Sequence, residues 1–197
     1  MKKFTSKILL AVLVVSMFVL VITSKVSFAH TPDIVAKAQI FGSDITGKLI
    51  LEQGENGIVQ VSLALRGDPT VLTPGLHGVH IHEKSICEED AQPRFTTAGG
   101  HFDPGPFGNS TPVQDNHPYH LGDLPNIEID ERGEGRLETV TSRITLSPSP
   151  VSIFDRDGSA IIVHQNRDEM VAEGTAAQSG GGRLACGVIE QMKDFSF

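Results

Sequence analysis

Residues 46–65 read TGKLILEQGENGIVQVSLAL, which is the pattern of two strands joined by a tight turn. The turn is GENG at residues 54–57, and Asn-Gly between two apolar runs is a strong signal for a β-hairpin. From Val59 to Leu65 every second residue is a large aliphatic one. A period of two buries one face of a strand and leaves the other in water, so this stretch predicts a half-buried antiparallel pair.

Short β-rich segments continue on both sides of this hairpin, and no segment shows a helical stripe of ten or more residues. The strands that we expect are Ile34–Phe41, Thr46–Gln53, Val59–Leu65, Leu76–His82, Ile127–Asp130, Arg136–Thr141 and Ala160–His164. Two long irregular stretches interrupt them, Glu83–Asn126 and Gln165–Gly182. Such strand spacing predicts an all-β sandwich or barrel in one domain, and long loops in a compact domain usually serve a function.

Composition narrows the class of protein. The chain has 197 residues, of which 39% are hydrophobic and 20% charged, and this is typical of a globular protein. It has no Trp, one Tyr and a formal net charge of -8, so a nucleic-acid partner is not expected.

Residues 1–29 have the pattern of a secretory signal peptide. Three lysines precede an apolar run at residues 8–22, and Ser27-Phe28-Ala29 offers small residues where a signal peptidase cuts. We expect cleavage after Ala29, leaving a domain of residues 30–197 in the periplasm or outside the cell. The alternative is a retained membrane anchor, for which a fifteen-residue apolar run is short, since a bilayer span needs about 20.

The domain has two cysteines, Cys87 and Cys186. An exported protein with two cysteines most simply pairs them, and two free thiols are the alternative.

Histidines are concentrated in one part of the chain, since six of the eight fall between His77 and His120. His80 and His82 lie two residues apart on an expected strand, so both imidazoles point to one face. A pair of imidazoles is a natural start for a metal site, whereas a single strand histidine is usually only hydrogen-bonded.

Further candidate ligands follow. His101 comes after two glycines, His117 and His120 precede Asp123, and His164 ends an apolar run. Imidazole and carboxylate together suit zinc. The alternatives are a solvated polar loop for residues 117–123 and a satisfied core histidine for His164.

Five segments in order resemble the motifs of the copper–zinc superoxide dismutases, and the match covers essentially all of residues 30–197. The segments are Gly75–Glu83 (GLHGVHIHE), Gly99–Pro104 (GGHFDP), His120–Asn126 (HLGDLPN), Ile162–His164 (IVH) and Gly182–Ile189 (GRLACGVI). The short gap from His82 to Cys87 resembles the exported bacterial branch. The fold so implied is a Greek-key β-sandwich or flattened barrel with long metal-binding and electrostatic loops.

The resemblance also implies a role for each matching residue. Copper ligands would be His80, His82, His101 and His164, with His101 as the imidazolate that bridges copper and zinc. Cys87 and Cys186 match the intrasubunit disulfide. Arg183 matches the arginine that attracts superoxide, although it could equally brace a loop by bonding carbonyls. Asp168 matches the aspartate that links the two metal sites through ligand histidines, and His77 a loop-bracing histidine that binds no metal.

The zinc site departs from the family pattern. His120 and Asp123 match zinc ligands, but residues 104–116 contain no histidine where the family has its remaining one. We expect His117 to complete the four ligands that zinc prefers, with Asp115 or no residue as the alternatives. The link from Asp168 to a zinc histidine depends on the same assignment.

The implied activity is the conversion of superoxide to oxygen and hydrogen peroxide at a copper that is alternately reduced and reoxidised. The alternatives are an exported copper/zinc carrier or scavenger without turnover, and a structural protein with a zinc-stabilised loop. Without residues 1–29 the chain has 12 Lys and Arg against 24 Asp and Glu, a net charge of -12. An anionic substrate therefore needs a local positive region, centred on Arg183 and the metals. We expect no stable membrane partner after cleavage. A homodimer is possible, because dimers through different faces and monomers both occur in the family.

Overall fold

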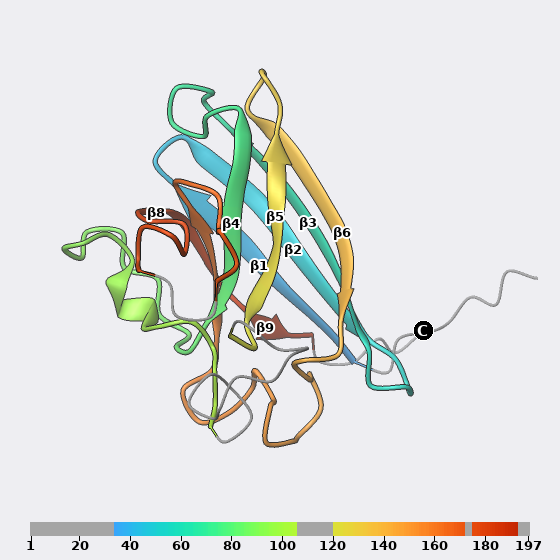
Figure 1. Ribbon diagram of the computed structural model, residues 1–197. Helices are drawn as coiled ribbons and strands as arrows, with labels where there is room; N and C mark the ends of the chain where they lie inside the picture. The colour runs from blue at the N-terminus through green and yellow to red at the C-terminus, as the bar shows by residue number, and fades with distance from the viewer. Residues whose placement is uncertain (1–33, 106–119, 172–174, 193–197) are drawn as a thin grey trace, which may run out of the picture.

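The computed structural model describes residues 34–105, 120–171 and 175–192 (Figure 1). Within these ranges the regular elements are nine strands and one short 3-10 helix. They are β1 (Ile34–Gly42), β2 (Ile45–Gln53), β3 (Val59–Gly67), β4 (Gly75–His82), η1 (Thr96–Ala98), β5 (Asp123–Ile129), β6 (Glu134–Thr141), β7 (Ala160–His164), β8 (Arg183–Val188) and β9 (Glu190–Gln191).

The strands form a closed antiparallel barrel. Their order is β2-β3-β6-β5-β4-β7-β8-β1, and pairing of β1 with β2 closes the ring, while β9 adds to the edge of β1. Strands β4, β5 and β6 are neighbours, and β3 lies beside β6 instead of β4, which is a Greek-key arrangement. The predicted all-β Greek-key architecture is confirmed.

The hairpin predicted around residues 54–57 is present. Strands β2 and β3 pair from Ile45↔Gly67 to Gln53↔Val59, and Gly57 has a φ of 76°, a left-handed conformation that favours glycine. The alternate residues Val59, Val61, Leu63 and Leu65 are all buried. The period-two pattern therefore identified the core face correctly.

One continuous cluster of aliphatic and aromatic side chains fills the barrel. Each fully buried Leu or Ile contributes about 1.5–3 kcal/mol relative to an exposed one, so the barrel does not depend on a metal for its core. A second cluster of Phe95, Ala98, Ala160, Ile162 and Cys186 lies outside this core. It packs part of the loop after β4 onto β7 and β8.

Two stretches differ from the expected elements. β5 starts at Asp123, four residues before the expected Ile127, so the irregular stretch after His82 ends earlier than Asn126. Strands β8 and β9 were not expected from the sequence. The short side chains of Leu184-Ala185-Cys186-Gly187 give no clear alternation, and the strand is defined by its pairing with β7 and β1.

Two loops cover the outside of β4 and β7. The first, called the disulfide loop, is residues 83–105. The second, called the glycine loop, joins β7 to β8 at residues 165–182, of which the structure describes 165–171 and 175–182. Among the described residues, no helix is long and apolar enough to cross a membrane. Residues 1–29, and with them the expected signal peptide, lie outside the described residues.

Candidate metal centre

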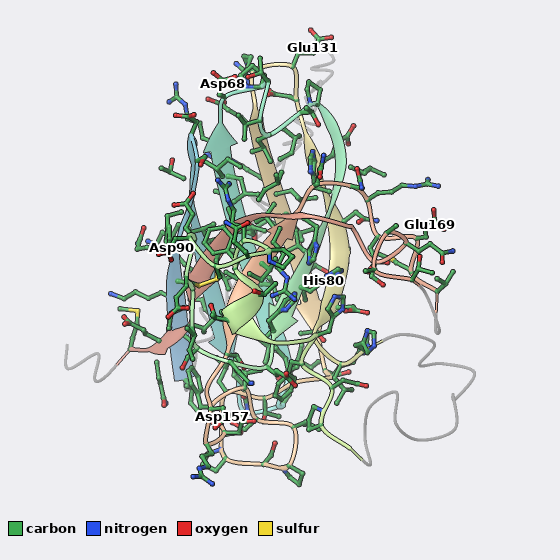
Figure 2. All side chains as sticks on the ribbon, turned by 90° about the vertical axis from the view of Figure 1, so that its left-hand side faces the viewer. Asp68, His80, Asp90, Glu131, Asp157 and Glu169 are labelled. Carbon is green, nitrogen blue, oxygen red and sulfur yellow. A yellow bond between two sulfur atoms is a disulfide. The ribbon has the colours of Figure 1, made fainter. Side chains whose placement is uncertain are left out.

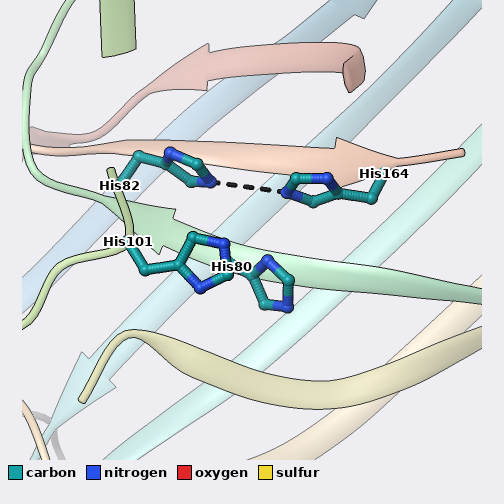
Figure 3. Close-up of side chains that lie close together, drawn as sticks. All are labelled: His80, His82, His101 and His164. Atoms are coloured by element: carbon teal, nitrogen blue, oxygen red, sulfur yellow. Dashed lines mark hydrogen bonds between the residues drawn. The ribbon is translucent and has the colours of Figure 1, made fainter. Parts of the chain in front are cut away.

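Four imidazole rings gather outside the barrel core, beside β4 and β7 (Figure 3). On β4, Val79 and Ile81 point into the core, so His80 and His82 face the opposite way, toward the covering loops. His164 ends β7, and His101 from the disulfide loop pairs with His82 as an isolated bridge.

The backbone of Ile81 holds the loops next to these strands. Its N–H donates to the carbonyl of Gly122 at 2.9 Å, and its carbonyl accepts from the N–H of Phe102 at 2.8 Å. Phe102 follows His101 in the chain, and Gly122 precedes Asp123. These two bonds therefore place the side chains of His101 and Asp123 beside β4. A Cβ at Gly122 would lie 2.3 Å from the Ile81 carbonyl, so only glycine fits there.

One nitrogen of each ring is available to a shared ion. The ligand atoms of the four histidines all lie within 4.8 Å of one another, and Nε2 of His82 and Nε2 of His164 are 3.4 Å apart. His80 Nδ1 is buried and has no hydrogen-bond partner among the residues that the structure describes. An unpartnered buried nitrogen is costly unless something binds it, so the donor set fits a metal that prefers imidazole, such as copper.

The other nitrogen of three of these rings is bound to the protein. His80 Nε2 is 2.7 Å from Asp168 Oδ2. His82 Nδ1 is 3.0 Å from the Gly99 carbonyl, and His164 Nδ1 is 3.2 Å from the Gly181 carbonyl. Such contacts fix the orientation of a ligand ring and the nitrogen that it presents.

Burial favours the neutral form of three of the rings, those of His82, His101 and His164. Burial, together with the charges of neighbouring rings, holds the pKa of His82 and of His164 well below the ordinary value of 6.5. Burial also lowers the pKa of His101. A neutral imidazole has a free lone pair, so these three rings can bind a metal at neutral pH without first losing protons.

A second group of ligands shares the ring of His101. His101 Nδ1 is 2.7 Å from Asp123 Oδ1, and His120 Nδ1 is 3.4 Å from Asp123 Oδ2. The hydrogen bond to Asp123 raises the pKa of His120. Burial alone would raise the pKa of Asp123, but its bonds to His101 and His120 lower it far below the usual range. His101 therefore belongs both to the cluster of four histidines and to the group with His120 and Asp123, as a bridging ligand would.

His117 and Asp115, the candidates for a fourth zinc ligand, lie outside the described residues. Among the described residues, the second group has three potential ligands, His101, His120 and Asp123.

Asp168 lies against the buried ring of His80 and is held by Asn126. The amide of Asn126 donates to the Asp168 carbonyl at 2.9 Å and accepts from its N–H at 2.8 Å. Burial would raise the pKa of Asp168, but bonds to His80 and to the N–H of Met170 lower it. The expected contact of Asp168 with His80 is thus present. The expected contact with a zinc histidine involves His117, which lies outside the described residues.

His77 contacts backbone on both sides of its ring. Nδ1 is 2.8 Å from the carbonyl of His164, and Nε2 is 2.7 Å from the carbonyl of Thr73. It lies outside the ligand groups found among the described residues and ties β4 to the end of β7.

Arg183 both braces a loop and lines a pocket. Its Nη1 donates to the carbonyl of Phe95 and its Nη2 to the carbonyl of Gly99, each at 2.6 Å. The pocket has a volume of about 460 Å³ and is also lined by His101 and His164. A guanidinium bound to neutral carbonyls keeps its charge, so the two roles weighed for Arg183 are compatible.

The disulfide between Cys87 and Cys186 is present. It ties the disulfide loop to β8, three residues beyond Arg183. The alternative of two free thiols is wrong.

Three contacts of the centre were not expected from the sequence. Arg143 Nη2 donates to the His120 carbonyl, Glu83 Oε1 accepts from the N–H of Gly100 at 3.0 Å, and Asn126 holds Asp168. Asn126 and Glu83 lie within quoted motifs, which could have drawn attention to them, whereas Arg143 does not. All three side chains bond backbone groups, and no residue spacing signals such contacts.

Comparison with known proteins identifies the family. Residues 45–189 match the family model of copper/zinc superoxide dismutase. The chain is 38% identical over 139 residues to a superoxide dismutase (Cu-Zn) of Deinococcus radiodurans, covering 68% of this chain and 71% of that protein. It is 34% identical over 164 residues to an extracellular superoxide dismutase (Cu-Zn) of Haemonchus contortus, covering 78% and 82%. A solved structure of the clock protein EA4 aligns with a TM-score of 0.60 and 32% identity, covering 81% of this chain and 94% of that one.

The family match spans β2 to β8 and includes every ligand candidate that the structure describes. The two ligand groups and the disulfide agree with it. The chain belongs to the copper/zinc superoxide dismutase family, and its cofactors are copper and zinc.

Proposed function

We propose that this superoxide dismutase holds copper with His80, His82, His101 and His164, and zinc with His101, His120 and Asp123. The observation that carries the assignment is the four-imidazole cluster, with His80 Nδ1 buried and unpartnered at its centre. The substrate is superoxide and the products are oxygen and hydrogen peroxide.

Copper, when bound, supplies the one-electron reduction and reoxidation that dismutation requires, whereas zinc has no redox chemistry. The chain supplies the geometry and a proton. Peroxide needs two protons, and we assign His101 to hold one of them at Nε2 whenever that nitrogen is not bound to copper. Asp123 Oδ1 lies 2.7 Å from Nδ1 of the same ring, so the two groups would share the zinc and keep the ring in place.

Arg183 would attract the anion to the pocket that it shares with His101 and His164. Its two bonds to loop carbonyls fix the guanidinium, so its charge is already in position when the substrate arrives. Electrostatic focusing of this kind, for which superoxide dismutases are a standard example, raises association rates by about 10- to 1,000-fold.

A carrier or scavenger without turnover is the less favoured function. Storage requires neither a pocket beside the ligands nor a fixed cation in it, and both are present. A purely structural zinc protein would not need His80, His82 and His164 to converge.

Metal content and superoxide decay, measured together on the processed protein, test the function. We expect copper near one per chain and rapid superoxide decay in pulse radiolysis. His164→Ala should lose copper and activity together, whereas Arg66→Ser, on the surface of β3, should retain both. Tight copper without turnover in the parent protein would instead favour the carrier.

Arg183 is tested separately. Arg183→Ala should lower the second-order rate constant and weaken its dependence on ionic strength, with copper content unchanged. An unchanged rate would leave Arg183 with the bracing role alone.

We also propose that His117 completes the zinc shell and contacts Asp168. Zinc in structural sites has four ligands, and the described part of the chain offers three. His117→Ala should reduce zinc content without removing copper. Asp115→Ala is the matched control, and loss of zinc from that variant instead would assign the role to Asp115.

Export of the chain is the setting that we propose for this activity. The disulfide and the relative named as extracellular support it. Cleavage after Ala29 predicts that the protein recovered from the periplasm or medium begins at His30, which N-terminal sequencing determines. A product that keeps residues 1–29 in the membrane fraction would show an anchor instead.

A homodimer is the assembly that we propose, on the family resemblance alone. Sedimentation at equilibrium would give twice the mass of residues 30–197 for a dimer and that mass itself for a monomer.

A further inference from the structure

A second guanidinium group lines the pocket that contains Arg183. Arg94, from the disulfide loop, lies at this pocket together with Arg183, His101 and His164. We propose that Arg94 is a further residue that guides superoxide into the pocket, and that Glu89 weakens its effect. The assignment rests on the proposed function of this site.

Arg94 is held in position from two sides. Its Nη2 donates to the hydroxyl of Ser43, in the turn between β1 and β2, at 2.7 Å. Its guanidinium carbon lies 5.9 Å from the centre of the Phe95 ring. Phe95 is completely buried, and its carbonyl is the acceptor for Arg183 Nη1. The two guanidinium groups therefore both contact Phe95, Arg94 at its ring and Arg183 at its carbonyl oxygen.

Glu89 is the acidic group closest to this cation. Its Oε1 accepts from the Ser43 hydroxyl at 3.0 Å and lies 3.5 Å from Arg94 Nη2. The side chains of Arg94 and Glu89 are 36% and 38% exposed. Water screens a half-exposed pair of this kind, so Glu89 reduces the field of Arg94 at the pocket without cancelling it.

The charge of the whole chain makes local cations important here. The acidic residues labelled in Figure 2 lie at the periphery of the molecule, around the more central His80. A superoxide ion approaching a domain with an excess of acidic residues must be drawn in by positive charge near the pocket. Arg94 adds a second such charge, and removing Glu89 should increase its influence.

Three variants test the two residues in opposite directions. Arg94→Gln removes the charge and keeps most of the stem over Phe95, Arg94→Lys keeps the charge, and Glu89→Gln removes the opposing one. The matched controls are Arg66→Gln and Glu134→Gln, because Arg66 and Glu134 form a similar ion pair at 3.6 Å on the barrel surface. For each copper- and zinc-loaded variant, the second-order rate constant with superoxide is measured by pulse radiolysis from low to high ionic strength.

We expect Arg94→Gln to lower the rate constant by about threefold at low ionic strength and to flatten its salt dependence. Glu89→Gln should raise the rate and steepen the dependence, a gain that misfolding cannot produce. Arg94→Lys should remain near the parent, both control variants should be unchanged, and all curves should converge at high salt. The assignment is overturned if Arg94→Gln and Glu89→Gln follow the parent curve, or change no more than the controls.

Azide binding separates this assignment from the proposed function. Absorption titration of the copper-loaded protein gives the azide dissociation constant without any turnover. We expect a weaker constant for Arg94→Gln and a tighter one for Glu89→Gln. If the parent shows no superoxide decay but these shifts occur, the proposed function fails and Arg94 still attracts anions. If the parent is active and azide binds all variants equally, Arg94 has no such role.

Discussion

At the scale of single residues, the carbonyl of Gly99 connects His82, a proposed copper ligand, to Arg183 in the neighbouring pocket. It is the acceptor for both His82 Nδ1 and Arg183 Nη2. Gly99 has a φ of 78°, and a Cβ there would lie 2.5 Å from Glu83 Oε1. Glu83 Oε1 in turn accepts a hydrogen bond from the N–H of Gly100, the residue after Gly99. The position of this one carbonyl therefore affects the orientation of His82 and of Arg183 together.

Gly99→Ala should accordingly weaken copper binding and lower the rate with superoxide at the same time. Gly57→Ala is the matched control, because Gly57 has a similar φ of 76° but nothing within 4 Å of an added Cβ. Both variants should lose stability, by roughly 1–3 kcal/mol, because both positions have a positive φ that residues with a Cβ rarely adopt. Only Gly99→Ala should lose copper affinity, measured by competition with a chelator. Equal copper affinities for the two variants would show that this carbonyl does not orient His82.

The histidines also predict the order in which the two metals leave on acidification. Protons compete with the metal for imidazole lone pairs. The bond to Asp123 raises the pKa of His120, so its proton displaces zinc at a higher pH than for an ordinary imidazole. Burial lowers the pKa of His82 and His164, so copper should be retained to lower pH. Metal analysis after dialysis at stepwise lower pH should find zinc released first; loss of copper before zinc would contradict this.

At the scale of elements, the disulfide fixes one of the two loops that line the pocket. Cys87 and Cys186 are 99 residues apart in the chain, and the bond joins the disulfide loop to β8. Phe95 and Gly99, whose carbonyls hold Arg183, belong to this loop.

Cys87→Ser should therefore lower stability and activity together. Loss of a native disulfide that closes so long a loop typically costs about 2–5 kcal/mol of unfolding free energy. Urea unfolding and the superoxide rate constant measure the two effects, and reduction of the parent protein should reproduce both. A variant with full activity and a lower unfolding free energy would restrict the disulfide to a purely stabilising role.

The elements also show what the sequence could predict. The β2–β3 hairpin and the strands carrying His80, His82 and His164 were predicted because alternation and turn residues are local signals. β8 was not, since its short side chains carry no alternation and its partners β7 and β1 are distant in sequence. The candidate ligands were found from the spacing of the histidines and assigned to copper or zinc by the resemblance. The backbone contacts of Gly99, Gly181 and Ile81 that orient them leave no mark on the side-chain pattern.

At the scale of the whole molecule, the hydrophobic core of the barrel contains none of the candidate ligands, but the metal-free centre should make the free energy of unfolding depend on pH. In the unfolded chain the rings of His82 and His164 titrate near 6.5, while burial lowers the pKa of both in the folded protein. Below pH 6.5 the unfolded state therefore binds more protons, and folding stability falls as pH falls. His120 has the opposite sign, because its raised pKa adds stability below pH 6.5 that is lost as pH rises through the folded value.

Three of these histidines have a lowered pKa, because burial also lowers the pKa of His101, and only His120 has a raised one. The metal-free protein should thus have a smaller unfolding free energy at pH 5.5 than at pH 7.5, measured by urea unfolding. The metal-loaded protein should change less over the same range, because its lone pairs are occupied and the bound ions stabilise the folded state. A metal-free protein whose stability rises on acidification would contradict the burial of neutral rings.

The central claim is that four imidazoles from separate parts of the chain hold one copper, and that the ring of His101 joins it to zinc. Crystallographic anomalous data at the copper and zinc edges of the loaded protein test this directly. The copper peak should lie among His80 Nδ1, His82 Nε2, His164 Nε2 and the ring of His101. The zinc peak should lie at His101 Nδ1 with His120 and Asp123, at nitrogen distances of about 2.0–2.1 Å. A copper peak away from the buried His80 nitrogen, or two metals with no shared ring, would contradict the account.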